Sequence, residues 1–249
     1  TGQAMEIVKK ALSLENVKLC GFHCHVGSQI FESQPFTDAS EIMLTFIAEV
    51  RDTLGYTAEI LNLGGGLGVR YTKADPEIDY GEKIKEVAEI LNTQCKKLRL
   101  SVPKILMEPG RSLVADAGMT LYTVGSVKEI KGYKNYVSID GGMTDNPRYT
   151  LYESPYTVIL ADRANDEKDY TATVAGRCCE SGDLIQEDVQ MPMPRRGEIL
   201  AVLTTGAYNY SMASNYNRVG RPPVVMLNSE RDYIAVRRET LKDLCALDE

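Results

Sequence analysis

The sequence has 249 residues, of which 43% are hydrophobic and 25% are charged, and its formal net charge is −7. These values are typical of a globular protein with one large domain or two ordinary ones. The sequence has neither the run of about 18 apolar residues that a transmembrane helix needs nor a basic stripe, so we expect neither a membrane nor nucleic acid as a partner.

The start of the chain predicts a helix. Residues 1–6 lack the basic and apolar regions of a signal peptide, which favours a cytoplasmic location. Ala4, Ile7, Val8 and Ala11 recur at helical spacing and should share one buried face.

Strands and helices then alternate along the chain. We predict a strand within 17–25, a helix over 33–54, a strand over 58–63, a helix over 79–98 and a strand over 105–107. The helix over 33–54 should bury Ile42, Leu44, Phe46, Ile47 and Val50. Such alternation implies a parallel sheet, as in a (β/α)8 barrel. Since only about three of the eight units of such a barrel are present, we expect the chain to begin inside one.

After residue 113 the pattern changes to short strand-like runs separated by turns. The runs lie at 118–129, 136–140, 156–160, 170–175, 198–203, 223–228 and 233–237. We therefore predict a partial α/β barrel over 1–113. An all-β domain, a β-sandwich or β-barrel with a short C-terminal helix, should follow over 114–249.

The cysteines and histidines do not predict a metal site or disulfides. All six cysteines are expected to be reduced, because the chain is long and lacks a secretory signal. On the predicted strand, alternation places Cys20 and Cys24 opposite His23 and His25. Four ligands therefore cannot converge on one zinc ion from this strand.

Polar or glycine-rich segments follow the predicted strands of the first region. His25 precedes Ser28 at one strand end, and Gly64-Gly65-Gly66 follows the next. Backbone N–H groups of successive glycines can bind a phosphate, although a tight turn explains the same pattern. At the third strand end, Glu108 could hold a protonated ring nitrogen and Arg111 could bind a carboxylate or phosphate. An internal ion pair between these two residues is the alternative.

Three segments of the β region carry reactive or polar side chains. Cys179, beside Glu180, could be an acid, a base or a nucleophile, whereas a small buried apolar cysteine is the commoner case. The turn ending at Arg148, with Tyr152 four residues on, joins a cation and a phenol. The run from Tyr208 to Asn217 is rich in hydroxyl and amide groups, which is typical of a functional loop.

Taken in order, these segments resemble the fold-type III pyridoxal-phosphate-dependent decarboxylases, which have an alanine-racemase-like barrel. The resemblance covers nearly the whole chain. It rests on the segments His23-Cys24-His25-Val26-Gly27-Ser28-Gln29, Gly64-Gly65-Gly66, Glu108-Pro109-Gly110-Arg111, Asp140-Gly141-Gly142-Met143, Cys179-Glu180-Ser181-Gly182-Asp183 and Gly206-Ala207-Tyr208.

The resemblance implies that pyridoxal 5'-phosphate is the cofactor. His25 would stack on its ring, Glu108 would pair with its nitrogen, and Ser28, the glycines and Tyr208 would contact its phosphate. The implied cofactor-binding residues are His25, Ser28, Gly64, Gly65, Gly66, Glu108, Pro109, Gly110, Arg111 and Tyr208.

The resemblance also implies a reaction and a substrate. Cys179 would be the catalytic acid, delivered across a homodimer interface to the partner's cofactor. The implied substrate-binding residues are Arg111, Arg148, Tyr152, Glu180 and Tyr208. They suit a substrate with a second amino-acid head, so we expect decarboxylation of meso-2,6-diaminopimelate to L-lysine and CO2. Carboxynorspermidine, ornithine or arginine as the substrate, and a non-catalytic partner-binding role, are the alternatives.

The family's cofactor lysine lies on the first barrel strand, which we expect to precede the region in this sequence. Lys9, Lys10 and Lys18 do not match that motif. We therefore expect the 249-residue chain alone to release no CO2 from diaminopimelate.

Overall fold

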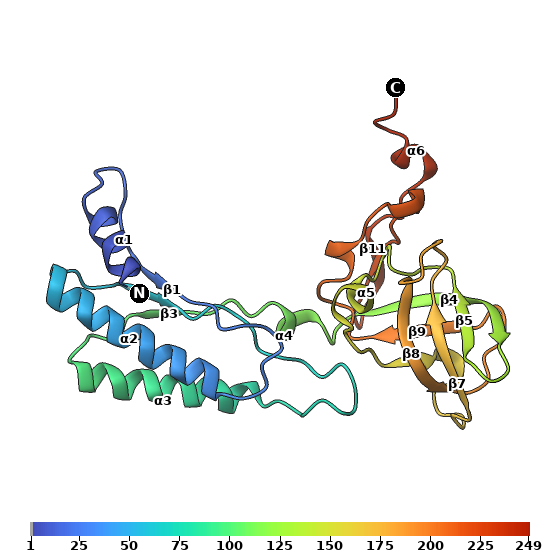
Figure 1. Cartoon of the computed structure of the whole chain (residues 1–249), viewed down its shortest axis with the longest axis horizontal. Coiled ribbons are helices and arrows are strands. Elements are labelled where there is room, and N and C mark those ends of the chain that lie inside the picture. The colour runs from blue at the N-terminus through green and yellow to red at the C-terminus, as the bar shows by residue number, and fades with distance from the viewer. Residues whose placement is uncertain (1) are drawn as a thin grey trace. The chain divides into compact units, whose positions relative to one another are not determined.

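The computed structural model describes residues 2–249 and divides the chain into two compact units (Figure 1). The first unit consists of the residues up to 70 together with residues 76–113. The second consists of residues 71–75 and 114–249. None of the helices in the described part of the chain has the length and apolarity that crossing a bilayer requires.

The first unit is built on a parallel sheet with the strand order β1-β2-β3. The strands are β1 (Gly21–His23), β2 (Ile60–Asn62) and β3 (Lys104–Leu106). The helices are α1 (Gln3–Leu12), α2 (Gln34–Leu54), α3 (Tyr80–Leu98) and the short α4 (Arg111–Val114). Because α2 connects β1 to β2 and α3 connects β2 to β3, the unit has the strand–helix repeat of a (β/α)8 barrel.

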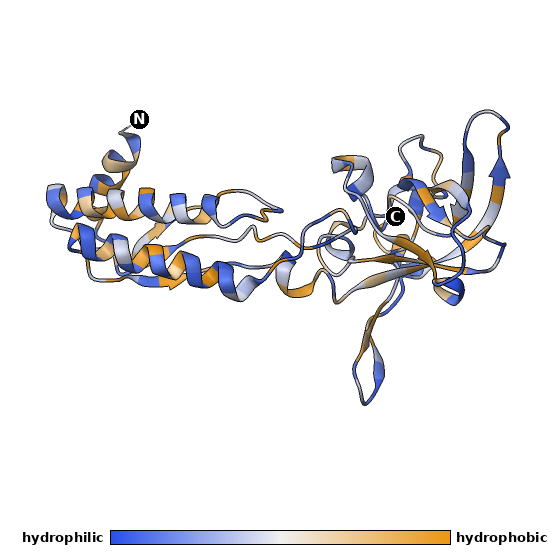
Figure 2. Cartoon of the chain, turned by 90° about the horizontal axis from the view of Figure 1, so that it is seen from below, coloured by the Kyte–Doolittle hydropathy of each residue, from blue (hydrophilic) through white to orange (hydrophobic). Residues whose placement is uncertain are grey.

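Local signals fix the ends of the two long helices. The side chain of Asp79 accepts the N–H of Glu82 at 3.1 Å and caps the start of α3. Gly55, with φ of 68°, ends α2 in the left-handed conformation that favours glycine. Hydrophilic and hydrophobic residues alternate along these helices in Figure 2, as expected for helices with one buried face.

The core of the first unit lies between these helices and the sheet. Its fully buried members include Phe36, Leu44, Leu61 and Leu63. The prediction that Ile42 is buried is wrong, because its side chain is 66% exposed. At about 100° per residue, Ile42 and Leu44 lie on opposite sides of α2, so only one of them can face the sheet. Ile7 is also exposed, and Val8 is the buried residue of α1.

The second unit contains a mixed sheet of six strands in the order β6-β9-β4-β5-β7-β8. The strands are β4 (Met119–Glu129), β5 (Asn135–Ile139), β6 (Val158–Leu160), β7 (Tyr170–Ala175), β8 (Leu184–Met191) and β9 (Ile199–Leu203). Only β5 and β7 pair in parallel. The N–H of Tyr156, just before β6, donates to Oε1 of Gln186 in β8 at 2.9 Å. The two edges of the sheet therefore approach each other, and the sheet is nearly closed.

Shorter elements complete the second unit. Strands β10 (Val224–Leu227) and β11 (Asp232–Val236) form a separate antiparallel hairpin. The remaining elements are α5 (Arg148–Tyr152), α6 (Leu241–Leu244) and the 3-10 turns η1 (Ala161–Arg163), η2 (Tyr210–Met212) and η3 (Tyr216–Arg218). The predicted fold class, part of an α/β barrel followed by an all-β region, is confirmed. The strand β8 was not predicted.

The positions of Leu44 and Ile42 on α2 lead to a stability prediction. Leu44→Ala should destabilise the protein by about 2–5 kcal/mol, because it leaves a cavity in a fully buried site. Ile42→Ala, an exposed change on the same helix, should stay within about 0.5 kcal/mol. Urea denaturation of the purified protein measures both effects, and equal midpoints for the two variants would contradict this assignment of the core.

Candidate functional site

The three strands of the first unit end at one edge of the sheet. His23 pairs with Asn62, and Asn62 pairs with Leu106. Pairing continues beyond the strands, since the N–H of Cys24 donates to Asn62 O at 2.9 Å and the N–H of Leu63 donates to Leu106 O at 3.0 Å. The segments that follow the strands are therefore neighbours. This edge is where (β/α)8 enzymes carry their functional residues.

Gly64-Gly65-Gly66 packs between the two neighbouring strand ends. A Cβ atom on Gly65 would lie 2.2 Å from Glu108 O, and one on Gly66 would lie 2.3 Å from Gly27 O. Gly64 and Gly66 have φ of 68° and 113°, a backbone region that favours glycine. No other residue type fits here without moving the neighbouring backbone.

Two of these glycines already use their N–H groups within the chain. The N–H of Gly64 donates to Asn62 Oδ1 at 2.9 Å, and the N–H of Gly65 donates to His25 Nδ1 at 3.3 Å. Among residues 2–249, Gly66 N–H donates to no group. Of the three N–H groups, that of Gly66 is therefore the one without a partner in the described chain, and contact of all three with a phosphate stays a prediction.

Glu108 is held at the sheet edge by a residue that we did not predict. The Nδ2 group of Asn62 donates to Glu108 Oε1 at 2.7 Å. His23 Nε2 lies 3.9 Å from the same oxygen, and the Glu108 side chain is 58% exposed. Asn62 thus links the Gly64 N–H to the Glu108 carboxylate. The one signal in the sequence is a polar residue at the end of an apolar strand.

Ser28 and Arg111, both predicted site residues, are in contact. Arg111 is buried, and its Nη2 group donates to Ser28 Oγ at 2.9 Å. Pro109 and Gly110 connect Glu108 to Arg111, so the turn after β3 supplies both a carboxylate and a cation. A hydroxyl and a guanidinium side by side suit a phosphate or carboxylate group.

In the second unit, Arg148 lies against two of the predicted tyrosines. Its guanidinium carbon is 5.3 Å from the ring centre of Tyr152 and 5.4 Å from that of Tyr208. Its Nη2 group donates to Ser154 Oγ at 3.2 Å. Arg148 is 8% exposed, whereas Tyr152 is 62% exposed. A buried cation beside phenol rings is suited to bind an anion.

Arg148 and two nearby asparagines have buried donors that lack an acceptor. Among the described residues, Arg148 Nε, Asn146 Nδ2 and Asn209 Nδ2 have no hydrogen-bond partner. The hydroxyl of Tyr156 donates to Asn209 Oδ1 at 3.3 Å. Burial raises the pKa of this phenol to about 12, against the opposing effect of Arg148. Tyr156 therefore stays neutral beside the cation.

Cys179 and Glu180 lie in the loop between β7 and β8, and both are exposed. The hydroxyl of Thr150 in α5 donates to Gly182 O of this loop at 2.6 Å. The Arg148 helix and the Cys179 loop are therefore neighbours. In the described structure the Glu180 carboxylate accepts only from its own loop, from Ser181 Oγ at 3.4 Å and Gly182 N at 3.5 Å.

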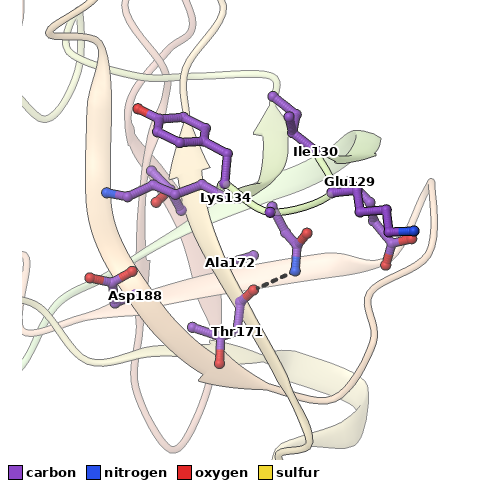
Figure 3. Close-up of a pocket in the computed structure, with 11 residues that line it drawn as sticks. Glu129, Ile130, Lys134, Thr171, Ala172 and Asp188 are labelled. Carbon is purple, nitrogen blue, oxygen red and sulfur yellow. Dashed lines mark hydrogen bonds between the residues drawn. The ribbon is translucent and has the colours of Figure 1, made fainter.

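A cavity of about 670 Å³ lies elsewhere in the second unit (Figure 3). It is lined by residues 129–135, 171–173 and Asp188, and Asn135 Nδ2 donates to Thr171 O across it at 3.0 Å. A second hollow of about 440 Å³ lies beside the Cys179 loop and is lined in part by Arg177 and Cys178. None of the predicted site residues lines either cavity. Across residues 2–249 no cluster of three His, Cys, Asp or Glu side chains is arranged for a metal ion.

Comparison with known proteins places these residues in a family context. Residues 1–115 match the model "Pyridoxal-dependent decarboxylase, pyridoxal binding domain". Diaminopimelate decarboxylase of Bacillus subtilis is 44% identical, over 99% of this chain and 56% of the relative. That of Halalkalibacterium halodurans is 46% identical, over 100% and 56%. The structure of M. jannaschii diaminopimelate decarboxylase with L-lysine has a TM-score of 0.92 and 35% identity, over 100% of this chain and 56% of that one. The chain thus spans about half the length of these relatives.

The raised pKa of Tyr156 predicts how stability depends on alkaline pH. The folded protein holds the phenol proton up to a pKa of about 12, whereas the pKa of a tyrosine in water is about 10. This contribution to stability is therefore complete below about pH 10 and is lost as pH rises towards 12. Tyr156→Phe should flatten the fall of the melting temperature over this interval. Melting curves as a function of pH measure the slope, and identical slopes in parent and variant would count against the assignment.

Proposed function

Since this chain belongs to the pyridoxal-dependent decarboxylase family, we propose that the protein containing it decarboxylates meso-2,6-diaminopimelate to L-lysine and CO2. The observation that carries the substrate assignment is the buried Arg148 beside Tyr152 and Tyr208. The curated relatives that match nearly the whole chain are named diaminopimelate decarboxylase.

The residues at the strand ends of the first unit fit pyridoxal phosphate. Glu108 offers an exposed carboxylate for a protonated ring nitrogen, and Asn62 fixes its Oε1 atom. Ser28 and Arg111 offer a hydroxyl and a guanidinium for the phosphate, together with the N–H of Gly66. The ring of His25 is exposed beside them. When bound, the cofactor acts as an electron sink that lets CO2 leave the substrate's α-carbon.

The role proposed for Cys179 is proton donation to that α-carbon after CO2 has left. Its thiol is exposed at a loop, as a donor to a bound substrate must be. From the family resemblance we propose a homodimer in which Cys179 of one subunit serves the cofactor of the other. The homodimer and the cytoplasmic location both stay predictions.

Arg148 and its tyrosines would bind the distal carboxylate of the substrate, and Glu180 would face the distal ammonium. A carboxylate would satisfy the buried donors Arg148 Nε, Asn146 Nδ2 and Asn209 Nδ2. A substrate that lacks the carboxylate leaves them unsatisfied, which costs about 1–3 kcal/mol for each group. The site should therefore discriminate against lysine and ornithine.

Arg148→Ala tests the substrate assignment. The variant should lose at least about 30-fold in kcat/KM for meso-diaminopimelate, equivalent to ~2 kcal/mol, because a buried partner of the carboxylate is removed. Arg196→Ala, an exposed arginine of the same unit, should keep the parent value. Steady-state kinetics of the parent should also show lysine and ornithine at least about 10²-fold poorer than diaminopimelate. Equal turnover of the three amino acids would refute the assignment of diaminopimelate as the substrate. Only the broader assignment as an amino-acid decarboxylase would then remain.

Glu108→Gln tests the assignment of the cofactor side. The amide is a poorer partner for a protonated ring nitrogen, so kcat should fall at least about tenfold, or ~1.4 kcal/mol. The variant should still bind pyridoxal phosphate, as followed by its visible absorbance. Glu86→Gln, an exposed change on α3, is the matched control. Parent-like turnover of Glu108→Gln would remove Glu108 from the mechanism.

A further inference from the structure

The loop that carries Cys179 is closed by its own backbone. The N–H of Gly176 donates to Asp183 O at 2.8 Å, so the two ends of the loop meet. Between them the N–H of Glu180 donates to Cys178 O at 2.9 Å. Because Cys179 is exposed, its own side chain does not anchor it in the core. The place of its thiol depends on what ties the loop to the rest of the unit.

The hydroxyl of Thr150 holds Gly182 O, and the N–H of Arg177 donates to Gly141 O at 3.1 Å. The carboxylate of Asp183 adds the tie that lies next to Cys179. Asp183 is only 2% exposed. Its Oδ2 accepts the N–H of Cys178 at 2.7 Å, and its Oδ1 accepts the N–H of Met143 at 2.6 Å. Met143 lies in the turn after β5, so one side chain joins two distant segments. Hydrogen bonds to a carboxylate are roughly twice as strong as those between neutral groups.

Two glycines pack directly against this carboxylate. A Cβ atom on Gly142 would lie 2.3 Å from Asp183 Oδ1, and one on Gly176 would lie 2.2 Å from it. Cβ atoms essentially never approach another atom closer than 3.0 Å. Glycine at both positions therefore lets the carboxylate reach both N–H groups, and the tight fit leaves it one position.

The same contact sets which of two adjacent cysteines faces outward. Cys178 is partly buried, and burial together with the Asp183 carboxylate raises the pKa of its thiol. Cys179, the next residue, is exposed. Rotation of the loop by one residue would exchange the two thiols. The bond from Cys178 N–H to Asp183 opposes that rotation.

We propose that Asp183 is a positioning residue that holds the Cys179 thiol in place by binding the N–H groups of Cys178 and Met143. This inference rests on the role proposed above for Cys179 as proton donor. A shift of about 1 Å in a reacting group can cost about 10²-fold in rate. Asp183 would therefore contribute to turnover without touching the substrate.

Asp183→Asn is the first test, because its NH2 group cannot accept one of the two N–H bonds. In the protein that contains this chain, kcat for meso-diaminopimelate should fall about 10²-fold. KM should change much less than kcat, since Arg148 keeps its place and only Glu180 moves with the loop. Iodoacetamide should alkylate Cys179 faster relative to the exposed Cys245 of the same molecule, as resolved by peptide mass spectrometry. Asp188→Asn, an exposed aspartate of β8, should leave all three quantities unchanged.

Gly176→Ala is the second variant and keeps Asp183 itself. Its methyl group would displace the carboxylate, so the same kinetic and alkylation changes should appear. If Asp183→Asn does not fold, Gly176→Ala alone tests the positioning role of Asp183. Parent-like kcat together with a parent-like alkylation ratio, in a folded variant of either kind, would overturn the proposal.

Cys179→Ala separates this inference from the proposed function. Full kcat in Cys179→Ala would refute the proton-donor role, whereas the alkylation ratio of Asp183→Asn would still report on the loop. If Cys179→Ala is slow but Asp183→Asn behaves like the parent in both assays, only the positioning role of Asp183 fails.

Discussion

The three strand ends of the first unit can lie together only because three successive glycines follow β2. Any Cβ atom on Gly65 would meet the backbone of Glu108, and any on Gly66 would meet that of Gly27. The close approach brings Asn62 within hydrogen-bonding distance of both Gly64 and Glu108. The position of the Glu108 carboxylate therefore depends on the absence of side chains at these glycines. The glycines contribute to the site more through close packing than through their N–H groups.

The second unit also has successive glycines that allow close packing after a strand, and here they pack beside a buried carboxylate. Glycines at 141 and 142 follow β5, and each packs against a polar side chain. Tyr122 donates to the carboxylate of Asp145, which also accepts the N–H of Gly142 at 3.1 Å. Burial raises the pKa of Asp145, against the opposing bond from Tyr122. Since Asp145 leads into the Arg148 turn and Asp183 holds the Cys179 loop, one glycine turn orders both segments.

Local signals in the sequence predicted the features that depend on residues close together in the chain, such as the two long helices and their ends. The helix over 33–54 was recognisable from its period and ends at a glycine, and the helix over 79–98 begins at a capping aspartate. Strand β8 was missed because Glu187 interrupts its alternation, a residue that is held by Lys134 and Tyr149. The roles of Asn62 and Asp183 were not predicted either, because both depend on contacts between distant parts of the sequence. Their partners lie up to 46 residues away, and no spacing rule reveals such contacts.

The surroundings of Arg148 bear on how the proposed substrate site would select by charge. Asn146 is fully buried, and its Nδ2 group has no acceptor among the described residues, as is true of Arg148 Nε. A buried donor without an acceptor costs about 1–3 kcal/mol, so a fold keeps such groups only with a compensating gain. Tyr156 stays protonated, because burial raises its pKa to about 12, so it offers Arg148 a neutral oxygen and no negative charge. An anion that enters beside Tyr152 would recover this energy, whereas an ammonium group would add repulsion from Arg148. Under the proposed function, the cation that would bind a distal carboxylate would therefore also reject a bare amine tail.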